Sequence, residues 1–441
     1  MKYYSTNRKA APATLQKAVV KGLAEDKGLY MPERIEALPQ LFFQEMANLS
    51  FHEIACRVAE AFFGEDVPAQ DLRNIVCDTL SFDVPVVPVT DRICSLELFH
   101  GPTLAFKDVG ARFMARMLRH FGNNDARTVN VLVATSGDTG SAVANGFLGV
   151  PGIHVYVLYP KGKVSAIQEC QFTTLGQNIT AVEVDGVFDD CQALVKNAFI
   201  DAQLTERMLL TSANSINVAR FLPQSFYYFY AYAQMVRMGL VPRYPEASNL
   251  VVSVPSGNFG NLCSALFGTR MGLPVKRFIA ANNANDPFYN YLQTATYQPK
   301  ASVQTIANAM DVGDPSNFAR ILDLYGHSHQ VISAHISGAT YTDAQIADTM
   351  RQCLHQTGYV LDPHGACGYQ ALQDSLQPGE VGVFLETAHP AKFKDTVEQI
   401  IQAPVAIPSR LQAFMQGKKQ SVPMSADFDA FRRFLLSEAE A

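Results

Sequence analysis

Residues 128–160 read TVNVLVATSGDTGSAVANGFLGVPGIHVYVLYP. An apolar, β-branched run ends in a turn of small polar residues, a helical segment follows, and a second apolar run closes the stretch. This order is typical of a parallel βαβ unit. Similar units recur at 178–238, 249–283 and 381–402. Because near-continuous apolar strands belong to sheets that are covered on both faces, we predict an α/β fold with two open, twisted, mostly parallel sheets and flanking helices.

The first part of the chain has a different pattern. Residues 13–24 place leucine and valine at four-residue steps, which indicates one face of a helix. We therefore predict a small, mainly helical N-terminal domain over 1–85, followed by the proline-limited linker SFDVPVVPVT at 81–90. The region 86–441 is expected to form two α/β domains, the smaller over roughly 95–215 and the larger from the remainder.

Composition excludes several classes of function. The chain has 441 residues, of which 48% are hydrophobic, and a formal charge of −6 at pH 7. An acidic chain without a basic run or a long apolar stretch is expected to bind neither nucleic acid nor a membrane. None of the eight cysteines belongs to a CxxC pair. We therefore predict no metal site and reduced thiols in a cytoplasmic protein without a secretory signal.

The stretch VVSVPSGNFGNLCSA at 251–265 carries a buried strand into a glycine-containing turn and then into a helix. Two glycines allow the backbone N–H groups to point inward, and the helix N-terminus adds the positive end of its dipole. Such a turn can hold a phosphate group, although an ordinary strand-to-helix turn has the same pattern. The candidate residues are Ser256, Gly257, Asn258, Phe259, Gly260 and Asn261.

A second turn at 135–141 also joins a strand to a helix. Its hydroxyl and backbone N–H groups suit a carboxylate or a phosphate, but Ser, Asp and Thr are also the usual helix caps. Both turns follow buried strands, and ligands of α/β proteins bind beyond the carboxyl ends of the strands.

Lys107 lies near the start of an amphipathic helix, after the apolar residues Leu104, Ala105 and Phe106. Burial and the helix dipole both disfavour its ammonium form, which makes it a candidate nucleophile or Schiff-base former. The alternative is a surface lysine whose stem covers apolar residues.

Several segments, in this order, resemble the threonine synthase family of pyridoxal-phosphate enzymes, whose fold is fold type II. They are MKYYSTNRKA, GLAEDKGLYMP, HGPTLAFKD, TSGDTGSA, LYPKGKVSAIQE, NSINVARFLPQ, SVPSGNFGN, AMDVGDPSNFAR, DPHGACGY and TAHPAKF. The resemblance covers nearly the whole chain. It implies conversion of O-phospho-L-homoserine and water to L-threonine and phosphate by a monomeric lyase of threonine biosynthesis.

The resemblance also implies roles for individual residues. Lys107 is expected to form the Schiff base with pyridoxal 5′-phosphate, the turn 256–261 to hold the cofactor phosphate, and Thr387 to face the ring nitrogen. Asp138 stands where related enzymes carry an asparagine, so we expect it to share a proton with the cofactor's 3′ oxygen or to turn toward the substrate. The substrate has two anionic groups, and their candidate holders are Ser136, Gly137 and Thr139 for one and Asn217, Arg220 and Lys392 for the other.

Two alternatives stay open at this point. One is another fold-type-II enzyme, such as a serine or threonine dehydratase or a β-replacement synthase. The other is a ligand-binding homologue without catalysis, although such a protein does not need Lys107, the turn 256–261 and Thr387 together.

Overall fold

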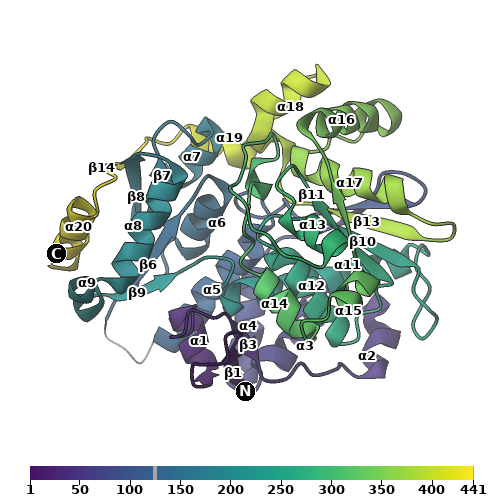
Figure 1. Ribbon diagram of the computed structural model, residues 1–441, viewed down its shortest axis with the longest axis horizontal. Coiled ribbons are helices and arrows are strands. Elements are labelled where there is room, and N and C mark those ends of the chain that lie inside the picture. The colour runs from purple at the N-terminus through teal and green to yellow at the C-terminus, as the bar shows by residue number, and fades with distance from the viewer. Residues whose placement is uncertain (123–126, 441) are drawn as a thin grey trace.

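The computed structural model describes residues 1–122 and 127–440, and Figure 1 shows their arrangement. The N-terminal part combines helices with a small antiparallel sheet of order β2-β1-β3. Its elements are β1 (Lys2–Ser5), β2 (Ala13–Thr14), α1 (Leu15–Lys21), β3 (Tyr30–Pro32), α2 (Gln40–Glu45), η1 (Met46–Asn48), α3 (Phe51–Phe63) and α4 (Ala69–Thr79). The sequence predicted the helices but not this sheet, because its strands are too short to show a period of two.

A parallel sheet of order β14-β8-β7-β6-β9 forms one lobe, on the left of Figure 1. Its strands are β6 (Val129–Ala134), β7 (Ile153–Pro160), β8 (Ile179–Asp185), β9 (Leu209–Ser212) and β14 (Val422–Ser425). The helices of this lobe are α6 (Asp138–Phe147), α7 (Ala166–Thr173), α8 (Phe188–Ile200), α9 (Ala202–Arg207), α19 (Ser409–Met415) and α20 (Phe428–Glu440). The predicted βαβ unit at 128–160 is thus β6-α6-β7.

The second large sheet has the order β12-β11-β10-β13-β5-β4, and only the β4–β5 pair is antiparallel. Its strands are β4 (Val86–Pro88), β5 (Ile93–Glu97), β10 (Leu250–Pro255), β11 (Arg277–Asn282), β12 (Ile336–Thr340) and β13 (Val381–Glu386). Its helices are α12 (Gly260–Arg270), α13 (Pro287–Thr294), η3 (Asn308–Met310), α14 (Phe318–Leu324), α15 (His329–His335), α16 (Asp343–Thr357), α17 (Pro363–Ser375), η4 (Pro390–Phe393) and α18 (Lys394–Ile401). Two mostly parallel sheets with flanking helices confirm the predicted fold class.

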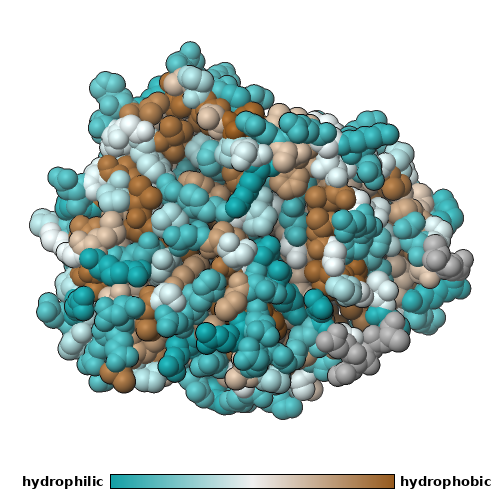
Figure 2. All heavy atoms as spheres, turned by 180° about the vertical axis from the view of Figure 1, so that it is seen from behind, coloured by the Kyte–Doolittle hydropathy of each residue, from teal (hydrophilic) through white to brown (hydrophobic). Residues whose placement is uncertain are grey.

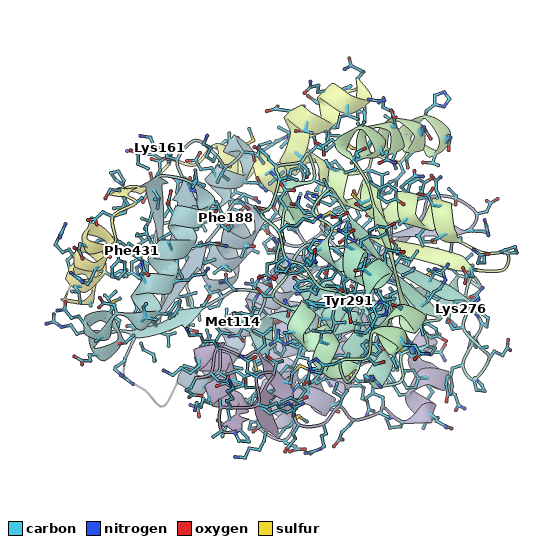
Figure 3. All side chains as sticks on the ribbon, viewed as in Figure 1. Met114, Lys161, Phe188, Lys276, Tyr291 and Phe431 are labelled. Atoms are coloured by element: carbon cyan, nitrogen blue, oxygen red, sulfur yellow. The ribbon has the colours of Figure 1, made fainter. Side chains whose placement is uncertain are left out.

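Helix α5 (Lys107–Gly122) lies between the lobes and packs against α1, α4, α6 and α10. Met114 of this helix is fully buried, whereas Lys161 and Lys276 point outward from the two sides in Figure 3. The helical stretch that ends the predicted unit at 178–238 is divided into α10 (Val218–Phe221), η2 (Leu222–Gln224) and α11 (Ser225–Arg237). Pro223 explains the division, because it has no N–H group to continue an α-helical ladder.

The C-terminal segment lies elsewhere than expected. Strand β14 pairs with β8, and α20 packs on α8, α9 and β14. Residues 422–440 therefore join the smaller sheet rather than the larger one. Strand β5 lies partly inside the range 95–215 that was expected for the smaller domain, but it belongs to the larger sheet. The segment before β14 is polar, so the sequence held no signal for this strand pairing. Ala441 lies outside the described residues.

The outer surface is mixed in character. Figure 2 shows small apolar patches separated by hydrophilic side chains on the face opposite to that of Figure 1. In the described parts of the chain, no helix combines the length and apolarity that a bilayer crossing requires.

Arg320 on α14 connects the N-terminal part to the rest of the chain. Its side chain is fully buried and donates to the carbonyl oxygen of Tyr30 from Nε at 3.3 Å and from Nη2 at 3.0 Å. It also donates to Asn317 Oδ1 at 2.6 Å and to Ile216 O at 2.5 Å. The guanidinium group lies 4.0 Å from the ring centroid of Phe221. One side chain therefore joins strand β3 to both of the segments that precede α10 and α14.

We predict that Arg320→Ala lowers the free energy of unfolding by about 3 kcal/mol, because it leaves buried carbonyl groups without donors and opens a cavity. The matched control is Arg8→Ala, which removes an ion pair with Asp323 from a side chain that is 59% exposed. That change is expected to cost less than about 1 kcal/mol. Urea unfolding of both variants tests this, and equal shifts of the two midpoints would contradict it.

Candidate active site

A short antiparallel contact brings two distant segments together. Ala105 bridges Ala388, Phe106 N donates to Thr387 O at 2.8 Å, and His389 N donates to Leu104 O at 3.1 Å. The first segment leads directly into α5, and the second follows β13. This contact fixes the backbone of residue 107 beside that of residue 387, although the two are far apart in the sequence.

Lys107 is the first residue of α5, and its side chain is half-buried. Nζ donates to Thr139 Oγ1 at 3.0 Å. Burial lowers the pKa of Lys107 to about 8; Asp138 opposes this shift, while the positive charges of Arg220 and Lys392 add to it. A half-buried lysine with a lowered pKa fits a nucleophile or Schiff-base former better than the alternative of a surface lysine.

Asp138 and Lys392 form a buried ion pair beside this amine. Lys392 Nζ lies 2.6 Å from Asp138 Oδ1 and donates to Thr103 O at 2.8 Å. Gln168 Nε2 donates to the same Asp138 oxygen at 3.0 Å. Burial alone would raise the pKa of Asp138, but the ammonium groups of Lys392 and Lys107 outweigh it and hold that pKa well below its usual range. Asp138 is therefore an ionised partner of Lys392, a role that the sequence did not predict.

The loop before Lys107 is held from within. Asp108 accepts hydrogen bonds from Thr103 N at 2.8 Å and from Thr103 Oγ1 at 2.6 Å. Gln171 Nε2 donates to Thr103 O at 3.1 Å. A Cβ atom at Gly101 would lie 2.4 Å from Asp108 Oδ2, so glycine is needed at that position for the loop to close. These contacts fix the direction in which α5 presents its first residue.

The turn between β10 and α12 offers a row of free donors. Among the described residues, no hydrogen bond uses the backbone N–H groups of residues 257–261. These groups lie at the N-terminus of α12, whose dipole adds a positive potential. Adjacent free N–H groups at a helix N-terminus fit a phosphate group without the help of a cationic side chain.

The two glycines of this turn act differently from the expectation. The left-handed residue is Phe259, with φ of 61°, and neither Gly257 nor Gly260 has a positive φ. A Cβ atom at Gly257 would lie 2.9 Å from Ala309 O, so this glycine allows residues 309–310 to pack on the turn. The Asn258 side chain donates to Ser215 Oγ at 2.7 Å and accepts from Ser316 N at 2.6 Å, which positions the turn from outside.

The turn between β6 and α6 is organised by Thr135. Its Oγ1 accepts from Gly137 N at 2.9 Å and from Gly140 N at 2.8 Å. The Gly137 N–H group is therefore already paired. Ser136 is exposed, and Thr139 is the hydroxyl that contacts Lys107. An anion-binding role for Ser136, Gly137 and Thr139 stays a prediction.

Asn217 and Arg220 lie on α10, at the side of the site where α5 packs. The Asn217 side chain caps the helix through Ala219 N at 2.9 Å and donates to Val19 O at 2.8 Å, so its amide is used within the protein. Arg220 is buried and donates through Nη1 to Ala213 O, while its Nε has no partner among the described residues. Burial lowers the pKa of Arg220 to about 10, and the Asp108 carboxylate partly opposes this shift.

Thr387 follows the last residue of β13 and is 7% exposed. Its backbone is fixed by the contact with Phe106, and no protein acceptor or donor among the described residues pairs with its hydroxyl group. Its predicted position opposite a ring nitrogen stays a prediction.

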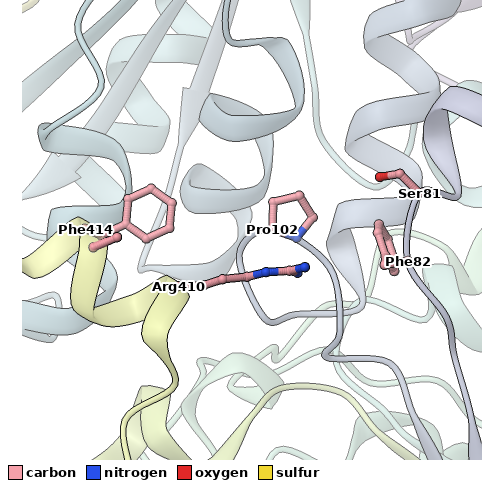
Figure 4. Close-up of a pocket in the computed structure, with 6 residues that line it drawn as sticks. Ser81, Phe82, Pro102, Arg410 and Phe414 are labelled. Atoms are coloured by element: carbon pink, nitrogen blue, oxygen red, sulfur yellow. The ribbon is translucent and has the colours of Figure 1, made fainter.

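A surface pocket of about 360 Å³ lies next to the loop that precedes Lys107. Figure 4 shows Arg410 and Phe414 of α19 on one side of it, Pro102 in the middle, and Ser81 and Phe82 of the linker on the other. Arg410 Nη1 donates to His100 O at 2.7 Å. The pocket contains none of the predicted site residues, but α19 holds the same loop from outside.

Comparisons with known proteins agree with this geometry. Residues 91–387 match the family described as pyridoxal-phosphate dependent enzyme, residues 2–80 match the threonine synthase N terminus, and residues 365–435 match the threonine synthase C-terminal region. Threonine synthase of Serratia marcescens is 44% identical over 437 residues, which cover 99% of each chain. The chain belongs to the threonine synthase family.

Solved structures of this family have the same fold. The threonine synthase of Escherichia coli superposes with a TM-score of 0.90 at 42% identity, covering 99% of this chain and 100% of the other. The threonine synthase of Brucella melitensis, solved with bound pyridoxal phosphate, has a TM-score of 0.93 at 32% identity and covers all of both chains. As a member of this family the chain is a pyridoxal-phosphate-dependent enzyme, and the half-buried Lys107 and the free-donor turn fit that cofactor.

Several residues of the site escaped sequence reasoning. Asp108, Gln168 and Thr103 hold the lysine loop and the Asp138 carboxylate through the hydrogen bonds given above. Each lies inside a segment that carries the family resemblance, and Asp108 directly follows Lys107. Their contacts join segments from three parts of the chain, so spacing alone could not reveal them.

We predict that Gly257→Ala weakens the affinity for pyridoxal phosphate by at least about tenfold, because the new methyl group collides with Ala309 O and forces the donor turn to shift. Gly260→Ala is the matched control, since its Cβ atom would be 3.4 Å from Ser215 Cβ, an ordinary contact. Fluorescence titration of the apoenzymes with the cofactor measures both. Equal affinities of the two variants would contradict the close packing of residues 309–310 on the turn.

We also predict that the Lys107 amine of the apoenzyme titrates near pH 8. Asp138→Asn removes a nearby negative charge and is expected to lower this midpoint, whereas Lys392→Met removes a nearby positive charge and is expected to raise it. Reductive methylation at a series of pH values, read by mass spectrometry of the Lys107 peptide, measures the midpoint. The exposed Lys161 in the same digest is the internal standard. Shifts in the same direction in both variants would contradict the charge arrangement.

Proposed function

We propose that this chain converts O-phospho-L-homoserine and water into L-threonine and phosphate, with pyridoxal 5′-phosphate held at Lys107. The observation that carries the proposal is the position of a lysine with a lowered pKa beside Thr387 at the end of β13, while the neighbouring parallel strand β10 leads into a turn of free N–H groups. The match to threonine synthases over the full chain supports this choice over a dehydratase or a β-replacement synthase.

When bound, the cofactor supplies an aldehyde that amines can join and a conjugated ring that accepts the electron pair left at a deprotonated carbon. In this proposal the N–H groups of residues 257–261 hold its phosphate and the Thr387 hydroxyl faces its ring nitrogen. A neutral hydroxyl leaves that nitrogen largely without a proton. The backbone contact between residues 104–106 and 387–389 keeps these groups in register with Lys107.

Lys107 is the proton carrier of the proposed reaction. Because burial lowers its pKa to about 8, a sizeable fraction of the amine is neutral at physiological pH and can act as a base. It takes the proton from the substrate Cα and then one from Cβ, after which phosphate leaves from Cγ. One of these protons returns to Cγ and the other to Cα, while water adds its hydroxyl group at Cβ and gives its own proton to the released phosphate. The Thr139 hydroxyl, 3.0 Å from Nζ, orients the amine between these positions.

The substrate brings two anionic groups into a site with an excess of buried positive charge. Lys107, Lys392 and Arg220 face it, while Asp138 neutralises one of them. We assign the phosphate of the substrate to the Arg220 side, where the buried Nε lacks a partner. The carboxylate is assigned to the turn of Ser136 and Thr139. Lys392 then pairs with Asp138, and Asn217 caps α10, so neither of them contacts the substrate.

The ligands of this enzyme are expected to be small molecules. A formal charge of −6 opposes nucleic-acid binding, and the free thiols found at all eight cysteines suit a reducing cytoplasm. We propose that the enzyme works there as a monomer. Light scattering of the purified protein at micromolar concentration would measure its mass, and a dimer mass would refute the monomer.

We predict that phosphate release from O-phospho-L-homoserine is at least about a hundredfold faster, in kcat/KM, than release from O-phospho-L-serine. Threonine is expected in equal molar amount to phosphate. Lys107→Ala is expected to lower kcat by at least about a thousandfold, whereas Lys161→Ala, at an exposed site, leaves it unchanged. Keto-acid formation from serine or threonine as the faster reaction would instead identify a dehydratase.

A further inference from the structure

Two buried carboxyl groups lie next to each other behind the site, and the reaction proposed above does not use them. Glu386 is the last residue of β13, and Asp362 is the N-cap of α17; both are fully buried. Asp362 N donates to Glu386 Oε1 at 2.6 Å. One oxygen of each group, Glu386 Oε2 and Asp362 Oδ2, has no donor among the described residues.

His364 completes this cluster, and its hydrogen bonds define its proton. Its Nε2 lies 3.1 Å from the backbone N–H group of Ala309, which can only donate, so Nε2 is an acceptor without a proton. The proton of the ring is therefore on Nδ1, which lies 2.5 Å from Asp362 Oδ1. His364 is consequently a neutral ring and brings no positive charge to balance the two carboxyl groups.

The carboxyl pair must then hold a proton, because two adjacent carboxylates without a cation cannot both stay ionised in a buried site. Asp362 accepts from the backbone N–H and the ring of His364, which favours its charged form. Among the described residues, Asp362 N is the one group that donates to Glu386. We infer that Glu386 is a carboxylic acid that donates to Asp362, and that Glu386, Asp362 and His364 form a positioning chain for the cofactor site.

The two ends of this chain touch both ends of the proposed cofactor site, so the inference rests in part on the proposed function. At one end, His364 Nε2 accepts a hydrogen bond from Ala309 N, and residues 309–310 pack on Gly257 of the donor turn. At the other end, Glu386 directly precedes Thr387. These three hydrogen-bonded residues thus fix the distance between the phosphate turn and Thr387, the residue that faces the ring nitrogen.

The surroundings of Glu386 fit this inference. A Cβ atom at Gly365 would lie 1.6 Å from Glu386 Oε2, so the glycine leaves room for the carboxyl group. Burial, and then the Asp362 carboxylate, raise the pKa of Glu386 well above its usual value. Glu97, the register partner of Glu386 on β5, adds to this shift, and its own carboxylate is bound by Tyr359 and His100.

The proton is tested in the apoenzyme by infrared spectroscopy at about pH 8, where an ordinary carboxyl group is ionised. We expect the C=O band of a buried carboxylic acid in the wild type and its loss in Glu386→Gln. The amide of Gln can still donate to Asp362, so this variant is expected to fold. Asp108→Asn is the control, since burial also raises the pKa of Asp108. This variant is expected to keep the C=O band of Glu386. A band unchanged in Glu386→Gln would overturn the inference.

The positioning role is tested with a pair of variants at His364. His364→Leu removes the acceptor of Ala309 N and is expected to weaken pyridoxal-phosphate binding by roughly tenfold. His364→Gln can accept from Ala309 N and donate to Asp362, and it is expected to restore binding to within about threefold. If His364→Leu does not fold, Glu386→Leu takes its place, because it breaks the same chain at the other end. Wild-type affinity in the chain-breaking variant would overturn the role.

Hydrogen exchange separates this inference from the proposed function. In the apoenzymes, the peptide that spans residues 305–312 is expected to exchange slowly in the wild type and in His364→Gln, and faster in His364→Leu. This reading needs neither cofactor nor turnover. A wild type that fails to bind pyridoxal phosphate would refute the proposed function and leave the exchange result standing. Equal exchange in all three proteins would refute the positioning role of Glu386, Asp362 and His364.

Discussion

The contact between residues 104–106 and 387–389 is the constraint on which the site depends. Within the described parts of the chain, a short bridge of two backbone hydrogen bonds joins the segments, and each segment leads directly into a functional element. One continues into α5, which begins with Lys107, and the other leaves β13 after Thr387. Because both segments are buried, a shift of one must move the other. The reactive lysine is thus positioned by the larger sheet, although its contact partner Thr139 comes from the smaller one.

Buried charge gives the site its chemical character. Lys107, Lys392 and Arg220 bring three positive charges close together, and Asp138 pairs with one of them. Burial and mutual repulsion lower the pKa of Lys107, which prepares its amine to act as a base and a nucleophile. The same excess of positive charge suits a substrate with two anionic groups. Behind the site, the neutral His364 and the protonated Glu386 leave a single negative charge, on Asp362, in the second polar cluster.

The sequence predicted the strand–turn–helix units because their patterns are local: apolar runs, small-residue turns and helical spacing. It also placed Lys107 at a helix start and the donor turn after a buried strand. Other features depend on contacts between distant segments. The pairing of Lys392 with Asp138, the packing of Ala309 on Gly257 and the left-handed Phe259 have no local pattern. The position of β14 on the smaller sheet was mispredicted for the same reason, since this strand has four residues and follows a polar segment.

The proposed function requires one particular amine, that of Lys107, to hold the cofactor. Borohydride reduction of the holoenzyme, followed by digestion and mass mapping, identifies this amine, because a second lysine, Lys392, lies beside the same site and pairs with Asp138. We expect the reduced pyridoxyl group on the peptide that carries Lys107 and on no other lysine. A label on Lys392, or a cofactor that is released without any label, would contradict it.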